Sequence, residues 1–286
     1  MSKYTSIDLF SGPGGLCTGL RWAGIKALIA VEWSYWTVQT YAASHYADIF
    51  DLEAYLNGTL ENADEFFKPH DNTLLIYGDI NKVEISLIKK ILKERFSKDT
   101  VDLVTGGAPC ESFSMAGDRK EDDDRNSLYQ NVLRIAKGVE ADMFMFENVK
   151  GLFSKKYKGK TGAMYKHICE EFQEGKEEFA KQNYPKKLYT ARNRRLVLSE
   201  PSFTVTSHCL DEMIHPVLDR SLTPREAARL QSFPDWYIFE GPYVKFHSDP
   251  EQGQYEQIGD AIPPLLGKVL GEEIIKTLDV INEVKE

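Results

Sequence analysis

The first 150 residues alternate five times between a short apolar segment and a stretch with the apolar spacing of a helix. Strands are expected at residues 5–10, 25–31, 74–77, 101–104 and 143–146, and helices at 16–23, 36–46, 85–96 and 128–137. This alternation is typical of a mainly parallel β-sheet with helices on both faces. We therefore expect an α/β, Rossmann-like fold that binds its ligand at the carboxyl ends of the strands.

Residues suited to binding or catalysis follow each of these strands. The glycine-rich turn Ser11-Gly-Pro-Gly-Gly15 follows the first strand and leads into a helix, and Glu32 ends the second. Asp79, Pro109–Cys110 and Glu147–Asn148 follow the third, fourth and fifth strands. Their shared position at one sheet edge is more informative than any one of them alone.

The glycine turn and Glu32 together predict a site for a nucleotide-like ligand. Glycines let the backbone approach a ligand closely, and a helix start offers free N–H groups. Glu32 lies 20 residues after Gly12, where a carboxylate can bind ribose hydroxyls. These features alone leave dinucleotide oxidoreductases and methyltransferases equally open, beside a tight turn that binds nothing.

Cys110 and Glu147 each have a plain structural interpretation. Most free cysteines are small buried apolar residues, and an acid after a strand often caps a helix or forms an ion pair. A cysteine beyond a strand end, with Pro109 fixing the backbone before it, is also a good nucleophile near neutral pH. Burial beside Phe146 would raise the pKa of Glu147 and favour its protonated form. A nucleophile and an acid in one cleft suit addition to an electron-poor ring.

Five segments, in order, resemble the motifs of the cytosine-5 DNA methyltransferases. They are Asp8-Leu-Phe-Ser-Gly-Pro-Gly-Gly15, Gly106-Gly-Ala-Pro-Cys-Glu-Ser-Phe-Ser114, Glu147-Asn-Val149, Arg220 to Asp235, and Gln257-Ile-Gly-Asp-Ala-Ile-Pro-Pro264. The resemblance covers about residues 1–150 and 200–286, and it implies a class I methyltransferase-like fold with a small recognition region.

The resemblance implies S-adenosylmethionine as cofactor. In the family, the acid after the second strand binds the ribose, the acid after the third meets the adenine amino group, and two flanking side chains enclose the adenine ring. The matching residues here are Glu32, Asp79, and Phe10 with Trp33. The full expected cofactor set is Phe10, Ser11, Gly12, Gly14, Gly15, Leu16, Glu32, Trp33, Asp79, Ile80, Asp260 and Ala261.

The resemblance also implies a catalytic set of Cys110, Glu147, Asn148 and Pro109. Cys110 would attack carbon 6 of cytosine while Glu147 supports ring nitrogen 3, so that carbon 5 accepts the methyl group. In duplex DNA the base must first leave the stack. Ser114 is a further candidate for substrate binding, and the charged loop from Met115 to Asn126 would close over the base.

The chain departs from the family pattern at three places. Glu111 stands where Gln is frequent, and Asp260 stands where Asn is usual. Only 71 residues separate Val149 from Ser221, whereas the family has a Gln-x-Arg-x-Arg segment and then a long target-recognition region. Either Arg192 and Arg194 belong to a degenerate form of that arginine segment, or the segment is missing, displaced or supplied by another chain; we favour the second.

These departures suggest three parts. Residues 1–150 form a catalytic and cofactor-binding domain, 151–219 a reduced target-recognition region, and 220–286 a segment that packs back on the first part. Within them we expect a helix around 165–179, two short strands within 192–208, a capped helix from Thr223 and a closing helix over 265–278.

The charge is unevenly distributed. The formal net charge is −9, which argues against a general nucleic-acid binder. Residues 150–195, however, hold 13 Lys and Arg against 5 Asp and Glu, while the other 240 residues hold 22 against 39. This basic segment is either a DNA-binding surface or a solvated helix; if it binds DNA, the affinity should depend steeply on salt.

The remaining features exclude some classes of protein. The chain has no apolar run of about 18 residues and no apolar signal core at its start. Its four cysteines form no CxxC pair, so we expect a cytoplasmic protein. We predict no metal site, since the six histidines form no HxxxH or HxH pair and His208–Cys209 would face opposite sides of a strand.

Three alternatives to DNA methylation stay open. One is cytosine-5 methylation of RNA, another is a methyltransferase-like subunit that is active only with a partner chain, and the last is a nicotinamide-dependent oxidoreductase. The oxidoreductase shares the glycine turn and Glu32 but leaves Cys110 and Glu147 unexplained.

Overall fold

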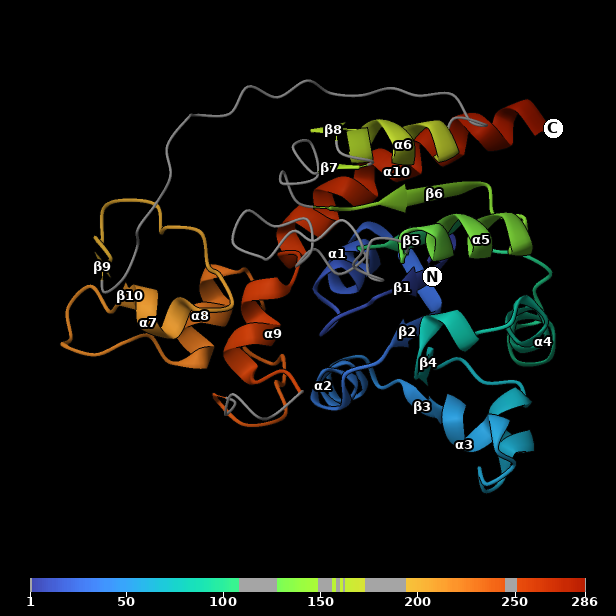
Figure 1. The fold of residues 1–286 in the computed structure, drawn as a ribbon, viewed down its shortest axis with the longest axis horizontal. Helices are drawn as coiled ribbons and strands as arrows, with labels where there is room; N and C mark the ends of the chain where they lie inside the picture. Colours follow the sequence, from blue (N-terminus) through green and yellow to red (C-terminus); the bar gives the residue numbers. More distant parts are fainter. Residues whose placement is uncertain are drawn as a thin grey trace.

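A computed structural model gives the structure of residues 2–107, 128–148, 156–157, 160–161, 163–172, 194–244 and 251–285. A large lobe is built on a central sheet, and a small lobe of short helices lies beside it (Figure 1). No helix within these ranges is long and apolar enough to cross a membrane.

The sheet of the large lobe has six parallel strands in the order β3-β4-β2-β1-β5-β6. The strands are β1 Tyr4–Leu9, β2 Ile25–Glu32, β3 Asp48–Asp51, β4 Leu74–Tyr77, β5 Leu103–Gly106 and β6 Met143–Phe146. The predicted α/β fold is confirmed. The strand order reverses at β1, between β2 and β5, where such sheets bind their ligands.

Two of the strand predictions need correction. The fourth expected strand, 101–104, lies two residues later as β5, because Val101 is buried before the strand begins. The edge strand β3 was not predicted. It has only four residues, begins and ends with Asp, and pairs with β4 alone, so its sequence carries little apolar pattern.

Helices cover both faces of the sheet. On one face, α1 (Gly15–Ala23), α2 (Tyr35–His45) and α10 (Pro264–Lys285) bury side chains that include Leu20, Tyr41 and Leu278. On the other, α4 (Ile85–Phe96) and α5 (Gln130–Val139) enclose the largest apolar cluster. The short helices are α3 (Leu52–Leu56), η1 (Ala63–Phe67) and η2 (Ile80–Lys82).

Helices α1 and α10 pack at backbone contact. A Cβ on Gly19 would lie 2.5 Å from the carbonyl carbon of Gly267 and would overlap the carbonyl oxygen of Pro264. A Cβ on Gly15 would likewise overlap the carbonyl oxygen of Ile262. The closing helix is thus fixed against the helix that follows the glycine turn.

The small lobe has its own apolar core, which includes Leu196, Met213, Tyr237 and Ile258. Its elements are β9 (Arg194–Arg195), α7 (Cys209–Glu212), β10 (Met213–Ile214), α8 (Pro224–Leu230) and α9 (Gln254–Asp260). The capping box predicted at Thr223 is confirmed, since its hydroxyl accepts from Glu226 N.

Other expectations for this region were wrong. Of two strands expected within 192–208, only β9 occurs in the described part, and the chain turns at Val197–Glu200. His208 is the N-cap of α7, so His208 and Cys209 do not lie on a strand. Between the lobes lie β7 (Lys156–Tyr157), β8 (Lys160–Thr161) and α6 (Ala163–Phe172), the last within the helix expected around 165–179.

Candidate cofactor-binding and active site

The glycine turn leaves β1 through three residues with left-handed backbone angles. They are Phe10 at φ +53°, Gly12 at φ +55° and Gly14 at φ +91°. Glycine adopts this conformation readily, whereas for Phe10 it costs on the order of 1–3 kcal/mol. No atom lies within 4 Å of the position that a Cβ on Gly12 would take. The backbone at Gly12 is therefore open to a ligand.

Glu32, at the end of β2, is tied to this turn. Its Oε2 accepts from Gly12 N at 2.9 Å, and its Oε1 accepts from Trp33 N at 2.9 Å and Ser34 N at 3.0 Å. Burial raises the pKa of Glu32, and the three N–H donors oppose that rise. A carboxylate offers about four acceptor positions, so Oε2 can accept one more hydrogen bond.

The other expected cofactor residues are placed around the same strand ends. Trp33 is 68% exposed, and Leu16 and Ile80 are buried. Asp79 is exposed, and its Oδ1 accepts from Asn81 N at 2.9 Å. The buried hydroxyl of Ser11 has no hydrogen-bond partner among the described residues.

The segment at the end of α9 also reaches the glycine turn. Ala261 is buried, and the next residue, Ile262, places its carbonyl against Gly15. Asp260 is exposed and accepts from Gln252 Nε2 at 3.0 Å. The structure therefore brings residues 250 positions apart to one site, as their motifs suggested.

Glu147 lies at the carboxyl end of β6, followed by Asn148. Its N–H donates to Gly106 O at 3.0 Å, and its Oε2 lies 2.9 Å from where a Cβ on Gly107 would be. The carboxyl group therefore rests on the backbone that leads to Cys110. Burial raises the pKa of Glu147. A protonated carboxyl is the form that can donate to a ring nitrogen.

Some expected site residues lie outside the described residues. They are Pro109, Cys110, Ser114 and Arg192, together with most of the basic segment. Arg194 is described: it begins β9, and its guanidinium lies 3.6 Å from the centroid of the Phe203 ring, in the small lobe.

The sequence model of one protein family matches the chain in three overlapping segments, residues 4–68, 61–176 and 157–276. That family is the C-5 cytosine-specific DNA methylases. The chain belongs to this family.

Relatives of this cytosine-5 methylase are bacterial enzymes. Type II methyltransferase M.DdeI of Desulfomicrobium norvegicum is 24% identical over 407 residues, covering 98% of this chain and 90% of that protein. Type II methyltransferase M.Eco47II of Escherichia coli is 24% identical over 379 residues, with 98% and 81% covered. Because this chain has only 286 residues, the first alignment includes more than a hundred positions that it lacks.

Two solved structures share the fold of this cytosine-5 methylase. A prophage-encoded protein of E. coli, solved as a candidate DNA modification methyltransferase, has a TM-score of 0.59 at 19% identity, with 97% of this chain and 100% of that chain covered. The Dnmt2 methyltransferase of S. pombe has a TM-score of 0.56 at 14% identity, with 96% and 99% covered.

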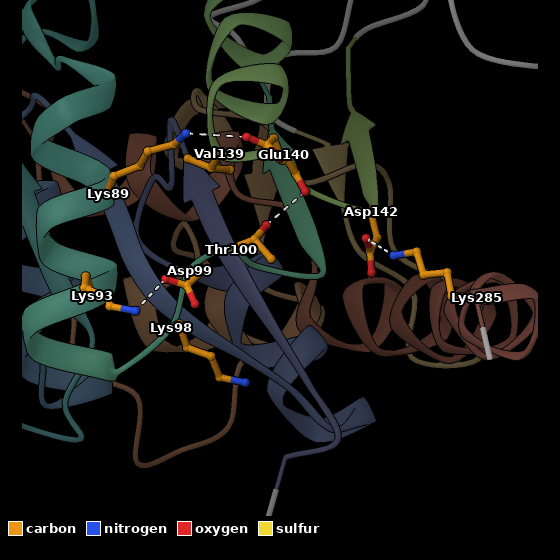
Figure 2. A pocket seen from close by; sticks show the side chains of 9 residues that line it. All are labelled: Lys89, Lys93, Lys98, Asp99, Thr100, Val139, Glu140, Asp142 and Lys285. Atoms are coloured by element: carbon orange, nitrogen blue, oxygen red, sulfur yellow. Dashed lines mark hydrogen bonds and ion pairs between the residues drawn. The ribbon is translucent and has the colours of Figure 1, made fainter.

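A hollow on the large lobe lies away from these motifs (Figure 2). It is lined at the amino ends of β5 and β6, opposite the carboxyl ends that carry Glu32 and Glu147. Lys93 pairs with Asp99 at 2.7 Å and Lys89 with Glu140 at 3.6 Å, and Lys285 pairs with Asp142. The charges in this hollow largely neutralise one another. No metal-binding group of three His, Cys, Asp or Glu occurs in the described part of the chain.

Three buried polar residues near the glycine turn were missed from the sequence. Asp8 lies on β1, His45 on α2 and Tyr237 in the small lobe. Burial raises the pKa of Asp8 to about 7, and its Oδ2 has no partner among the described residues. Asp8 precedes the turn directly, which was a usable signal. His45 and Tyr237 reach the turn only through the fold.

Proposed function

We propose that this chain transfers a methyl group from S-adenosylmethionine to carbon 5 of cytosine in DNA, through a covalent Cys110 adduct. The observation that carries this proposal is the position of Glu147 against Gly107, at the sheet edge that also holds the glycine turn. It occurs in a chain that the methylase family matches from residue 4 to residue 276.

The described residues around the glycine turn fit this cofactor. The open backbone at Gly12 leaves room for the ligand, and Ser11 offers a buried hydroxyl. Glu32 Oε2 would accept from a ribose hydroxyl, and the exposed Trp33 ring offers a stacking surface. When bound, S-adenosylmethionine supplies an electrophilic sulfonium methyl group.

The chain's own residues would prepare the cytosine ring. The Cys110 sulfur adds to carbon 6, and Glu147 holds a proton at ring nitrogen 3, so electron density rises at carbon 5. The raised pKa of Glu147 supports this role, because an acid that keeps its proton can share it. After carbon 5 is methylated, loss of its proton and release of Cys110 restore the aromatic ring.

Transfer of labelled methyl groups from S-adenosylmethionine to mixed-sequence duplex DNA tests this proposal. We expect 5-methylcytosine with the wild type and with Cys209→Ser, whose thiol lies in the core of the small lobe. We expect no detectable product with Cys110→Ser, although calorimetry should show that it still binds the cofactor. Methylation by Cys110→Ser would contradict the covalent mechanism.

A second candidate function is that of a subunit active only with a partner chain. The positions that this chain lacks relative to M.DdeI favour it, as does the short stretch between Val149 and Ser221. In that case the wild type binds S-adenosylmethionine but methylates neither duplex DNA nor a stem-loop RNA. Activity then appears only when a second protein is added.

A further inference from the structure

The small lobe sends one side chain beneath the glycine turn of the large lobe. Tyr237 is fully buried, and its ring packs on Phe233 at 4.8 Å and on Phe239 at 5.3 Å between centroids. Its hydroxyl donates to the carbonyl oxygen of Pro13. The two residues are 224 positions apart in the sequence.

His45 joins the same cluster from the end of α2. Its Nε2 lies 3.1 Å from the Tyr237 hydroxyl and 3.3 Å from Gly14 O. The Thr18 hydroxyl donates to Gly14 O at 2.8 Å. Since the Tyr237 and Thr18 hydroxyls donate to carbonyls, His45 Nε2 must carry its proton and donate. Burial lowers the pKa of His45 to about 4, so the ring is neutral at pH 7.

The fit beneath the turn is close. A Cβ on Gly14 would lie 2.5 Å from His45 Nε2 and 2.8 Å from the Tyr237 hydroxyl. Two consecutive carbonyls, those of Pro13 and Gly14, are thus held on the inner side of the turn. A trans peptide unit is planar with its C=O and N–H opposed, so fixing the Gly14 carbonyl also fixes the direction of the Gly15 N–H, the first of helix α1.

The small lobe is attached to α2 by further buried hydrogen bonds. The Thr40 hydroxyl donates to Gln257 Oε1 at 2.6 Å and accepts from Glu240 N at 2.8 Å. The Ser44 hydroxyl donates to Ile238 O at 2.9 Å. The position of Tyr237 under the turn is therefore set by the small lobe as a whole.

We propose that Tyr237 and His45 are positioning residues that hold the glycine turn in its cofactor-binding shape, so that affinity for S-adenosylmethionine depends on the small lobe. This inference rests on the proposed function, because it takes the turn as the cofactor site. Neither side chain needs to touch the cofactor. Each acts through the backbone of Pro13 and Gly14.

Tyr237→Phe tests this inference, with Tyr255→Phe as the matched control. Tyr255 is also buried in the small lobe, and its hydroxyl donates to a backbone carbonyl, that of Leu222, at 2.5 Å. Each variant loses one buried hydroxyl and keeps its ring, but only Tyr237 reaches the turn. A similar loss of stability in both is expected.

Calorimetry and steady-state kinetics give the deciding values. We expect Tyr237→Phe to raise the Kd for S-adenosylmethionine about five- to tenfold, as for one lost hydrogen bond, with kcat at saturating cofactor within about twofold of the wild type. Tyr255→Phe should leave the Kd unchanged. Equal Kd values for wild type and Tyr237→Phe overturn the inference, whereas a wild type that does not bind the cofactor overturns the proposed function itself.

Substitutions of His45 supply a second test that does not depend on Tyr237→Phe folding. His45→Gln keeps an N–H donor, while His45→Leu removes it. We expect the Kd to rise more in His45→Leu than in His45→Gln. Because the two side chains share the turn, the effects of Tyr237→Phe and His45→Leu should be non-additive. Equal Kd values for the two His45 variants contradict the inference.

Discussion

At the residue scale, the site combines carboxyl groups in different environments. Glu32 is buried but accepts three N–H donors, whereas Asp8 is buried with one hydrogen bond, from the Thr105 hydroxyl at 2.8 Å. Desolvation favours the protonated form of an acid, and N–H donors favour the charged form. The region under the glycine turn is therefore one where a carboxylic acid can stay neutral near pH 7.

Asp8 should make the protein less stable as the pH rises. Its pKa is about 7 in the folded state and about 3.8 when unfolded, so between these values the folded state alone holds the proton. By linkage, the free energy of unfolding falls as pH rises through this window and is flat above it. Asp8→Asn removes this dependence and can still accept from Thr105.

Urea unfolding at pH 5 and pH 8 measures the effect. Relative to the wild type, we expect Asp8→Asn to gain on the order of 2 kcal/mol between these pH values. Asp235→Asn is the control, because the Arg229 side chain lowers the pKa of Asp235, which stays ionised in both states above pH 5. The same pH dependence in wild type and Asp8→Asn would show that Asp8 is ionised in the fold.

At the scale of elements, sequence patterns located most of the large lobe. The strands at 74–77 and 143–146 and the helix at 85–96 have the predicted bounds, because buried parallel strands and amphipathic helices have strong apolar patterns. The edge strand β3 has no such pattern. Contacts such as that of Tyr237 with Pro13 carry no local signal at all, since they arise from packing across 224 positions.

Gly19 should be required for the packing of α1 on α10. An added methyl group at Gly19 meets the backbone of Pro264, Gly267 and Lys268, which cannot move aside as a side chain can. We expect Gly19→Ala to lower the free energy of unfolding by about 1–3 kcal/mol, although alanine is the better helix former.

Gly138→Ala in helix α5 is the matched control for this prediction. A Cβ there would meet only the side chain of Ile85, whose far end can rotate away. We expect its stability to equal or exceed that of the wild type by up to about 1 kcal/mol, measured by urea unfolding. If Gly19→Ala were as stable as Gly138→Ala, the helices would not be held at backbone contact.

At the scale of the whole molecule, charge separates two regions. The chain carries a net charge of −9, yet residues 150–195 hold 13 Lys and Arg against 5 Asp and Glu. The lysines of the hollow in Figure 2 lie on the large lobe, and at least three of them pair with acids there. If the protein binds DNA, the phosphates should therefore be bound by the basic segment and not by that hollow.

The dependence of DNA affinity on salt distinguishes these two groups of lysines. Each phosphate contact steepens the plot of log K against log salt by about 0.9, so the wild type should show a clear negative slope. Replacing Lys155, Lys156, Lys158 and Lys160 with Gln should make the slope shallower by several units of contact and weaken binding on all sequences alike. Replacing Lys89, Lys93, Lys98 and Lys285 with Gln removes the same charge and should leave the slope unchanged. Because both variants have the same net charge, a shared shift would mean that the overall field governs binding, and a flat wild-type plot would exclude the basic segment as the DNA-binding surface.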